Sequence, residues 1–509
     1  MASYFNPQLY PIVKIAFMMI MGIIAGNYLQ CHNSQIYILA IMALLIFVAV
    51  LKPRSWLVQS IAIYVCFFLY GCYMTVNASK ESSGICFDKP TLFKAVVLTT
   101  PIMGKRTFQT DLLVVDSNNT YKVKSNIMAV GNGKISELKI GDGIEVWSVP
   151  RSIDDNVGDG VSKFNYQTWL RTNGYKARTF IANDCWRRCM IDVSHVSILD
   201  KLRLFSVRLR RTILDNIRCL GLTGSELSIV SAMAFGDKSY VDRDLRDDYS
   251  NSGMSHLLAL SGLHLSIIYG MLLFLVYPFR RKILTQASVI IAIWVYVILV
   301  GMPYSVVRAA TMLTFCSLAF VLSRNHLSVN ILALAAIVIL SFSPHALNDV
   351  GFQLSFLAML SIYVIMPLIH GMKYLSGNIL NLLWRWLKGT VCVTLSVMIG
   401  TSPLVAYYFG IFSPISPIAN ILVLPIATIL LYMVMILLIP IPMLQSVVVK
   451  VVAILAKTQN DIVEFLSSLS ISHVKVIDMG IITLFSMYVL IISLVVIAYI
   501  VRRRYSLYR

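Results

Sequence analysis

Charged residues are scarce in this sequence. Only 13% of its 509 residues are charged, whereas soluble domains carry roughly 25%. Hydrophobic residues make up 58% of the chain, and the mean hydropathy is +0.76. This composition excludes an ordinary soluble globular protein and predicts a polytopic α-helical membrane protein.

Acidic residues are the scarcer of the two charge types. The 24 Asp and Glu are outnumbered by 43 Lys and Arg, which gives a formal net charge of +19. One interpretation places the excess of basic residues in cytoplasmic loops, as the positive-inside rule describes. The other is attraction of a polyanion such as nucleic acid. Composition alone leaves both interpretations open.

Motifs that hold metals or nucleotides are also missing. The nine cysteines have no zinc-ligand spacing, and no G-x-x-x-x-G-K-S/T loop is present to power movement. We therefore expect no metal, no cofactor and no motor within this chain. In an oxidising compartment, Cys86 and Cys185 are the favoured disulfide of the polar region; three free thiols, with Cys189, are the alternative.

Apolar runs predict a first group of membrane helices in residues 1–77. The short basic loop KPR at 52–54 predicts a cytoplasmic N-terminus and an outer position for residue 77. The first run has no signal-peptide cleavage pattern, so we expect it to remain as a helix. The three runs lie near 12–29, 36–50 and 56–76.

Residues 236–509 predict a multi-span region, and the terminal RRRYSLYR predicts a cytoplasmic C-terminus. The stretch NLLWRWLK at 381–388 is typical of an interfacial helix with aromatic and basic anchors. Segment 444–470 either crosses the membrane or lies on its surface. The predicted spans lie near 254–277, 286–302, 304–322, 328–342, 350–368, 389–409, 418–439 and 480–501.

A polar region at residues 78–200 separates the two groups of spans. Its short segments of alternating, β-rich sequence are broken by Gly, Asn and Asp. They predict an inserted small β-barrel of the OB-like type outside the membrane. Residues 201–235 then predict amphipathic basic helices. These helices either lie on the membrane surface or form a basic collar at a pore mouth.

The stretch HLLALSGLHLS at 256–266 places polar groups within an apolar run. Lipid offers such groups no hydrogen bonds. Counted as one helix from Ser252, the small residues fall on a single face, which favours close helix packing. The same stretch carries His256, Ser261 and His264, and ionisable groups at membrane depth favour a functional role. The alternative is a histidine hydrogen-bonded between helices.

Polar residues interrupt three later spans as well. Arg308 lies just inside a span, where it either meets phosphate or pairs with an acid, and Asp349 is the candidate acid. Asp349 and Gln353 lie four residues apart, on one helical face. Prolines around Asn420 break helices at membrane depth, which is tolerated only beside protein or a cavity. Together these residues predict a polar passage enclosed by helices.

Several long motifs resemble those of one family, the ComEC competence proteins. FGDKSYVDRDLRDDYSNSGMSHLLALSGLHLS is similar to the family signature, closely so at Gly236-Asp237-Lys238, at Ser252-Gly253 and from His256 to His264. GMPYSVVRAA, LNDVGFQLSFLA and PISPIANILVLP resemble three further family motifs in the same order. FNYQTWLRTNGY resembles a stretch near the end of the family's N-terminal region, so the resemblance covers nearly the whole chain.

The resemblance implies an inner-membrane channel through which single-stranded DNA reaches the cytoplasm during natural transformation. It implies an OB-like domain on the outer face that captures the strand, and we expect no enzymatic activity. The candidate channel residues are Asp237, His256, Ser261, His264, Arg308, Asp349, Gln353 and Asn420. The candidate DNA-binding residues are Phe108, Tyr121, Lys122, Lys124, Arg208, Arg210 and Arg211.

The chain departs from many family members because it has no H-x-H-x-D-H metal cluster of a C-terminal nuclease-like domain. A separate nuclease and a cytoplasmic helicase-like motor are therefore the expected partners, and a homo-oligomer is also considered. One rival function is a transporter of another anionic polymer or a lipid-linked substrate. A second rival is a membrane hydrolase that uses Ser261 or Ser255 with a histidine and Asp237.

Overall fold

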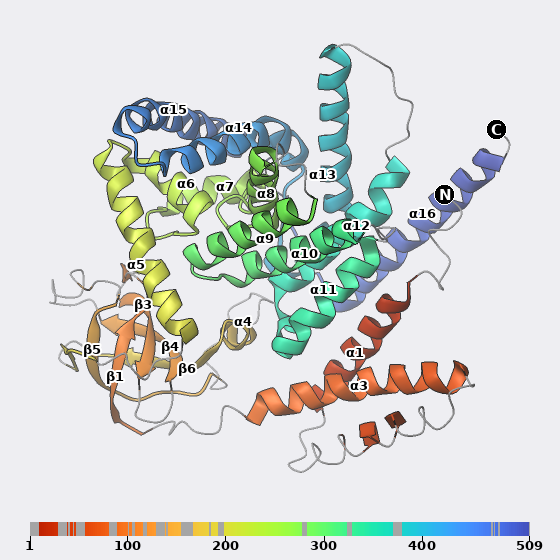
Figure 1. Ribbon diagram of the computed structural model, residues 1–509, viewed down its shortest axis with the longest axis horizontal. Coiled ribbons are helices and arrows are strands. Elements are labelled where there is room, and N and C mark those ends of the chain that lie inside the picture. The colour runs from red at the N-terminus through yellow and green to blue at the C-terminus, as the bar shows by residue number, and fades with distance from the viewer. Residues whose placement is uncertain are drawn as a thin grey trace.

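The computed structural model shows a mostly helical protein with a mixed β-sheet at one end (Figure 1). The polar sheet region and the apolar helices are thus separate in space as they are in sequence. The structure describes residues 10–28, 38, 41–43, 45–46, 56–80, 89–99, 101–103, 107–115, 120–128, 138, 141–153, 166–182, 185–191, 198–276, 282–322, 328–369, 379–469, 472, 474–476 and 479–507.

The described residues include eight helices that are long and apolar enough to cross a membrane. This confirms the prediction of a multi-pass membrane protein. The shorter apolar helices α8 (Gly262–Val276) and α11 (Ser328–Phe342) lie among them. The predicted span at 36–50 falls mostly outside the described residues. The long helices are α1 (Pro11–Tyr28), α3 (Trp56–Lys80), α9 (Lys282–Leu299), α10 (Tyr304–Val321), α12 (Val350–Ile369), α13 (Ile379–Phe409), α14 (Ser416–Leu437) and α16 (Ile481–Leu507).

Helices α1 and α3 approach each other closely because glycines line their contact. Gly22 and Gly26 on α1 lie four residues apart, and Gly71 faces them from α3. A Cβ on Gly22 would overlap the carbonyl oxygen of Phe68, so the two backbones meet directly. The thiol of Cys72 donates a hydrogen bond of 3.1 Å to the Gly22 carbonyl. The resulting helix pair packs against α11 (Figure 1).

The polar region forms a seven-stranded sheet with the order β6-β4-β3-β1-β5-β7, and β2 pairs with β3. All pairings are antiparallel except that of β4 with β6. Alternate residues of the strands point into one apolar core, which includes Leu112, Val123 and Ile144. The strands are β1 (Thr91–Val97), β2 (Ile102–Met103), β3 (Thr107–Val115), β4 (Thr120–Met128), β5 (Gly143–Ser148), β6 (Tyr175–Ile181) and β7 (Trp186–Arg188).

The predicted closed barrel is not confirmed by this sheet. Its two ends are β6 and β7, and no strand ladder joins them in the described part of the chain. One isolated bridge links Arg151, just after β5, to Arg178 on β6 through backbone hydrogen bonds of 2.8 and 3.0 Å. The sheet therefore curls toward closure at a single point without forming a continuous barrel.

Helices α4 (Tyr166–Thr172) and α5 (Ile198–Cys219) connect the sheet to the helical body (Figure 1). Helix α4 packs against the short helix η3 (Pro344–Asn348), and α5 packs against α9. Leu204 of α5 joins a small apolar cluster with Leu113 of the sheet. The sheet is thus held against the body at both helices.

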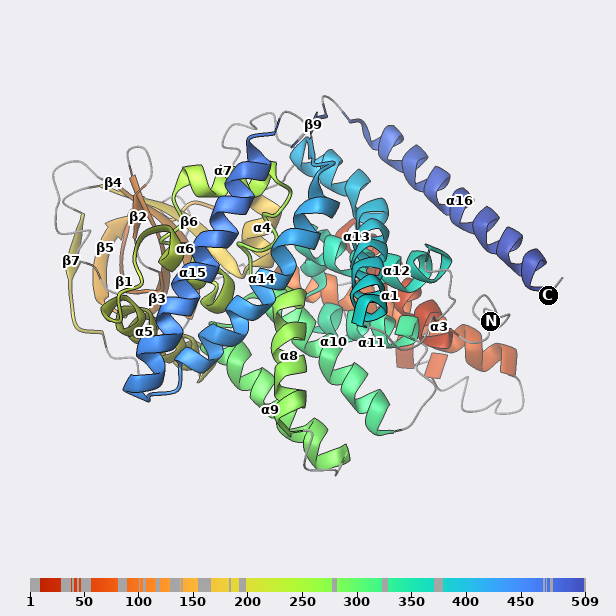
Figure 2. The same ribbon diagram turned by 90° about the horizontal axis from the view of Figure 1, so that it is seen from above.

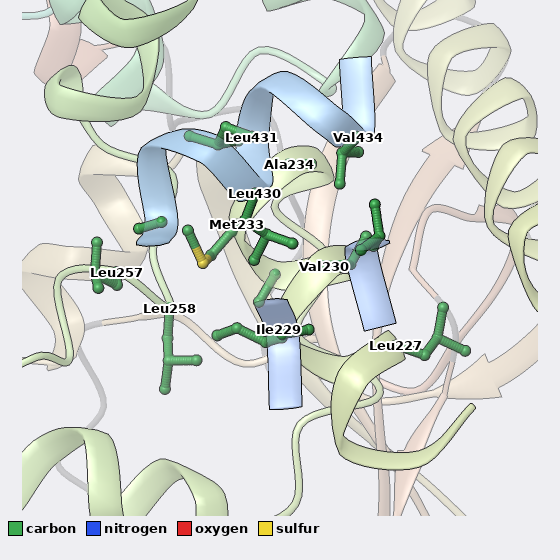
Figure 3. Close-up of a cluster of buried hydrophobic side chains, with 14 of the residues drawn as sticks. Leu227, Ile229, Val230, Met233, Ala234, Leu257, Leu258, Leu430, Leu431 and Val434 are labelled. Carbon is green, nitrogen blue, oxygen red and sulfur yellow. The ribbon is translucent and has the colours of Figure 1, made fainter. Parts of the chain in front are cut away.

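The largest apolar core lies where α14 and α15 (Pro442–Ser467) pack over α6 (Gly224–Phe235). Figure 3 shows side chains such as Met233, Leu257 and Leu430 converging there. The sequence left the placement of segment 444–470 open; its residues 444–467 form most of the long helix α15, which lies along α14 (Figure 2). A buried polar contact fixes it, because the Tyr249 hydroxyl donates to Asn460 at 2.9 Å.

The span predicted at 254–277 is wrong in its first third. Helix α7 (Arg243–Asn251) ends before it, and α8 begins only at Gly262. Gly253 has a φ of +76°, and the Met254 N–H returns to the Tyr249 carbonyl at 2.7 Å. This is a glycine-dependent helix stop. The continuous small-residue face counted from Ser252 does not exist, because residues 252–261 form turns.

The interfacial helix predicted at 381–388 is likewise not a separate element. Helix α13 runs without a break from Ile379 to Phe409. Trp384 and Trp386 on its first turns are exposed, as an aromatic anchor would be. The anchor is therefore the first part of a membrane-spanning helix.

Candidate functional site

The start of helix α10 brings several of the predicted residues together. The Ser305 hydroxyl donates a hydrogen bond of 2.8 Å to the Leu260 carbonyl. A Cβ on Gly262 would lie 3.4 Å from the Cβ of Ala309, so α8 and α10 begin side by side. We call the region formed by Ser261, His264, Ser305, Arg308 and Asp349 the α10 junction.

Arg308 forms a buried ion pair with Asp349 at the α10 junction. The guanidinium Nη1 lies 3.1 Å from Asp349 Oδ2, and both side chains are about nine-tenths buried, with 7% and 11% of each exposed. The same carboxylate oxygen accepts the Phe352 N–H at 3.0 Å and so caps the N-terminus of α12. Of the two roles considered for Arg308, pairing with an acid is the one that the structure shows.

Gly351 allows this pair to form. A Cβ at that position would come within 3.0 Å of both the Arg308 guanidinium and the Asp349 carboxylate. Arg308 also donates to the Ser355 hydroxyl at 3.3 Å. Gln353 of α12 accepts from the Tyr408 hydroxyl of α13 at 3.2 Å. The group therefore joins α10, α12 and α13 by polar contacts.

His264 and Ser261 form the second part of the junction. His264 Nδ1 lies 2.9 Å from the Ser261 hydroxyl oxygen and accepts the Ser261 N–H at 3.2 Å. Because Nδ1 accepts, the proton of a neutral ring is on Nε2. Nε2 is buried and has no hydrogen-bond partner in the described part of the chain. The imidazole thus holds the start of α8 and presents one unused donor.

The remaining channel candidates form no hydrogen bond or ion pair with the residues of the junction in the described part of the chain. His256 is exposed in the turns between α7 and α8. Asn420 Nδ2 on α14 donates to the Thr394 hydroxyl of α13 at 3.5 Å. Asn420 Oδ1 is buried without a partner among the described residues. Asp237 accepts the Ser239 N–H at 3.0 Å. Among the described residues no carboxylate contacts His264, so a serine–histidine–aspartate arrangement is not assembled.

The arginines of α5 are used mainly within the protein. Arg210 Nη1 donates to the carbonyls of Phe235, the last residue of α6, and Val300, the residue after α9, each at 3.2 Å. Its Nε lies 3.9 Å from Asp237. Burial lowers the pKa of the Arg210 guanidinium, and the charge of Asp237 opposes that shift. Arg210 therefore caps two helix C-termini, a role that the helical periodicity of α5 did not reveal.

The neighbouring arginines are more exposed. Arg208 donates to the Gly141 carbonyl at 3.4 Å, and Arg211 forms a pair of 3.9 Å with Asp215 one turn away. Pairs of this kind at a protein surface contribute little to stability. The side chain of Arg211 is 38% exposed, compared with 14% for Arg210.

We expect Arg210→Gln to lower the free energy of unfolding by about 1.5–3 kcal/mol, the range for lost hydrogen bonds of a charged group. The two helix ends would keep unpaired carbonyls. Arg211→Gln, the matched control, should change it by no more than about 0.5 kcal/mol. Thermal unfolding of the purified chain in detergent measures both. Equal melting temperatures of the two variants would contradict the capping role of Arg210.

The predicted DNA-binding residues of the sheet fall into two groups. Phe108 and Tyr121 are partly buried and pack against the sheet core, and their role in DNA binding stays a prediction. Lys122 and Lys124 lie on the opposite face of β4, with their Nζ atoms 5.2 and 5.7 Å from the centre of the Tyr175 ring. Lys124 also forms an ion pair of 2.7 Å with Asp111.

The aromatic residues beside these lysines were missed by the sequence reasoning. Tyr166 and Trp169 of α4 stack with ring centres 5.6 Å apart, and Trp169 stacks on Tyr175 at 6.1 Å. The spacing of Tyr166 and Trp169 by one helical turn in NYQTWLRTNGY is the signal that could have revealed part of this stack.

Only one cysteine of the predicted Cys86–Cys185 disulfide lies within the described residues. Cys86 lies outside the described residues, whereas Cys185 and Cys189 carry free thiols. Burial raises the pKa of the Cys189 thiol, and the charge of Glu145 raises it further. The described residues contain no group of three or more His, Cys, Asp or Glu side chains placed to hold a metal ion.

Comparison with known proteins places this site within a family. Residues 233–500 match the family model described as "Competence protein". The chain is 26% identical over 402 residues to ComE operon protein 3 of Bacillus subtilis, covering 78% of this chain and 48% of that protein. It is 21% identical over 328 residues to Recombination protein 2 of Haemophilus influenzae, covering 62% and 38%.

A further relative is an uncharacterized protein of Aquifex aeolicus, 27% identical over 203 residues and covering 40% of this chain and 43% of that one. The chain spans less than half the length of these curated relatives. No solved structure matches. The matched residues 233–500 include the whole α10 junction.

Proposed function

This chain belongs to the competence protein family, and on that premise we propose that it acts in DNA uptake, as part of the channel that brings single-stranded DNA through the inner membrane into the cytoplasm. The match over residues 233–500 supports this proposal, because it covers the helices that surround the α10 junction. The net charge of +19 is suited to a polyanionic cargo.

Two unpartnered polar atoms carry the channel proposal. His264 Nε2 on α8 and Asn420 Oδ1 on α14 are buried without partners in the described part of the chain. Helices α8 and α14 pack against each other, as Figure 2 shows. A buried polar group without a partner costs about 1–3 kcal/mol. Such a cost is repaid if a passing strand supplies the missing hydrogen bonds.

The buried ion pair of the α10 junction has a positioning role in this mechanism. Asp349 already neutralises Arg308, so Arg308 does not offer phosphate a free charge. The pair instead holds α10 against α12 and keeps the start of α8 in place through Ser305. A wall of fixed helices with a few unused polar atoms lets a strand slide without strong binding at any step.

The strand order supports the OB-like domain, which we propose to lie outside the membrane. Strands β5, β1, β3, β4 and β6 lie side by side in that order, and the Arg151–Arg178 bridge brings the two ends toward each other. A five-stranded, partly open barrel is the architecture of OB folds, which bind single strands.

We further propose that both termini are cytoplasmic and that the chain has no enzymatic activity. A separate nuclease would then degrade one strand, and a separate helicase-like motor would drive transport. Whether the chain forms a homo-oligomer is a question for a mass measurement in detergent.

The test compares DNA uptake in a deletion strain complemented with the wild-type chain or with Asn420→Leu. Labelled DNA inside the cytoplasm is measured separately from DNA held outside it. Deletion should abolish cytoplasmic DNA and leave outer capture intact. Asn420→Leu should reduce cytoplasmic DNA without reducing stability, because an apolar side chain removes an unpaired polar group. Leu263→Ala, on α8 beside His264, is the matched control.

An unchanged amount of cytoplasmic DNA in the deletion strain would contradict the proposal. It would favour the rival function, transport of another anionic polymer or a lipid-linked substrate. Normal uptake by Asn420→Leu, with deletion still abolishing uptake, would instead place the path away from the contact of α8 and α14.

A further inference from the structure

Three aromatic rings form a continuous stack where the sheet meets the helical body. Tyr166, Trp169 and Tyr175 lie one above another, with interplanar angles of 13° and 27° between neighbours. We call this stack the aromatic ladder. Tyr175 is the inner end, 7% exposed, whereas Tyr166 is the outer end and 44% exposed. A stack with one covered and one open end can be extended by another flat ring.

Packing contacts account for the inner rings of the ladder, Trp169 and Tyr175, but not for the outer ring, Tyr166. Leu170, Ile153 and Tyr175 form a small buried cluster, and Trp169 packs against it. These contacts hold α4 on the sheet. Tyr166 is not part of this cluster among the described residues, and its ring is exposed beyond the stack. Single exposed rings are common on protein surfaces, so what sets Tyr166 apart is its position at the open end of the ladder.

Positive charge lies beside the ladder. Lys122 and Lys124 both place Nζ within 6 Å of the Tyr175 ring centre, at 5.2 and 5.7 Å. Asp111 is occupied on both oxygens, since Oδ1 binds Lys124 and Oδ2 accepts the Tyr175 hydroxyl, each at 2.7 Å. Lys122 has no ion pair among the described residues. Lys122 is half-buried, and the charges of Arg203, Asp111 and Asp200 act on it, so an anion reaches its ammonium from the exposed side of the side chain.

The ladder lies close to the α10 junction. Helix α4 packs against η3, the segment that ends directly before Asp349. A Cβ on Gly174, between Trp169 and Tyr175 in the chain, would lie 3.7 Å from the Tyr304 hydroxyl at the start of α10. A ligand held on the ladder is therefore at the border between the sheet and the membrane helices.

From these contacts we propose that the aromatic ladder and Lys122 bind single-stranded nucleic acid, with a base stacked on Tyr166 and a neighbouring phosphate at Lys122. The inference rests on the proposed function, and it identifies where the strand passes from the sheet to the helices. Stacking on an aromatic ring needs no particular base, so the site tolerates any sequence. Duplex DNA is excluded, because its bases are already stacked on one another.

The test measures binding of fluorescent oligo(dT) to the purified full chain in detergent by fluorescence anisotropy. An abasic oligonucleotide of the same length is the second probe. Tyr166→Leu should weaken oligo(dT) binding about tenfold, the scale of one lost base–ring stack, and leave abasic binding unchanged. Tyr166→Phe should bind as the wild type. Lys122→Gln should weaken both probes and lower the salt slope of log K by about 0.7.

Matched controls come from the same sheet. Trp147→Leu removes an exposed ring on β5, and Lys94→Gln removes an exposed charge on β1; neither should change binding. If the wild type binds oligo(dT) and the Tyr166 and Lys122 variants bind equally well, the ladder is not the site and the uptake function stands. If the wild type binds oligo(dT) no better than the abasic probe, base stacking is ruled out. If it binds neither probe, both proposals are overturned.

Discussion

Arg308→Met should lower the free energy of unfolding by about 3–5 kcal/mol, because it leaves the Asp349 carboxylate buried without its partner. The two groups lie 3.1 Å apart and are nearly inaccessible to solvent. The double variant Arg308→Met/Asp349→Leu should regain much of that loss, since no isolated charge remains. Thermal unfolding in detergent of the wild type, the single variants Arg308→Met and Asp349→Leu, and the double variant gives the coupling energy of the pair.

Asp349→Asn and Ser355→Ala separate the contributions within this group. Asparagine keeps an oxygen for the Phe352 N–H, so the α12 cap survives while the charge is lost. Ser355→Ala removes only a 3.3 Å contact and should have a small effect. If Arg308→Met unfolds like the wild type and yet abolishes DNA uptake, the arginine serves a moving polyanion and the positioning role is wrong.

The pairing of Arg308 with Asp349 could be predicted because a membrane interior leaves a charge few options. A guanidinium inside an apolar span must find an acid, a carbonyl or water. Asp349 is an acid beside another span, and the structure confirms the choice. The spans themselves were predictable for the same reason: long apolar runs have no alternative to crossing the membrane as helices.

The roles of the α5 arginines could not be predicted in that way. A basic, amphipathic pattern is the same for a helix that meets a ligand and for one whose arginines cap other helices. Arg210 caps α6 and α9 because their ends at Phe235 and Val300 meet in space, and this meeting is a property of the tertiary fold. The aromatic ladder could not be predicted for a similar reason, because Tyr175 comes from strand β6 whereas the other two rings come from helix α4.

The start of α8 was mispredicted because small residues have two uses. In SNSGMSHLLALSGLHLS, serine and glycine suit both a close helix contact and a chain reversal. Hydropathy does not separate these uses, because Leu257, Leu258 and Leu260 make the turn segment resemble the start of an apolar span. The decisive feature is the positive φ of Gly253, which only the backbone geometry reveals.

Gly253→Ala should therefore be one of the most damaging single-methyl changes in the chain. Its φ of +76° disfavours any side chain by about 1–2 kcal/mol. The added Cβ would also overlap the Ser416 hydroxyl and approach that of Ser413 at 2.8 Å. Such overpacking costs about 1–3 kcal/mol. We expect lower unfolding free energy, reduced membrane levels and loss of DNA uptake.

Whether Gly253→Ala lowers or raises the free energy of unfolding distinguishes a turn at residues 252–261 from a continuous helix. If residues 252–261 continued a membrane helix, Gly253→Ala would stabilise it, because alanine is favoured over glycine in helices by about 1 kcal/mol. Gly270→Ala is the matched control: it lies within α8, nothing approaches its Cβ position within 4 Å, and it should be neutral or stabilising. Gly253→Ala/Ser416→Gly should recover only part of the loss, because the contact with Ser413 and the unfavourable φ both remain. If Gly253→Ala raised the melting temperature as Gly270→Ala does, the turn would be wrong, and with it the placement of Ser261 and His264 at the start of α8.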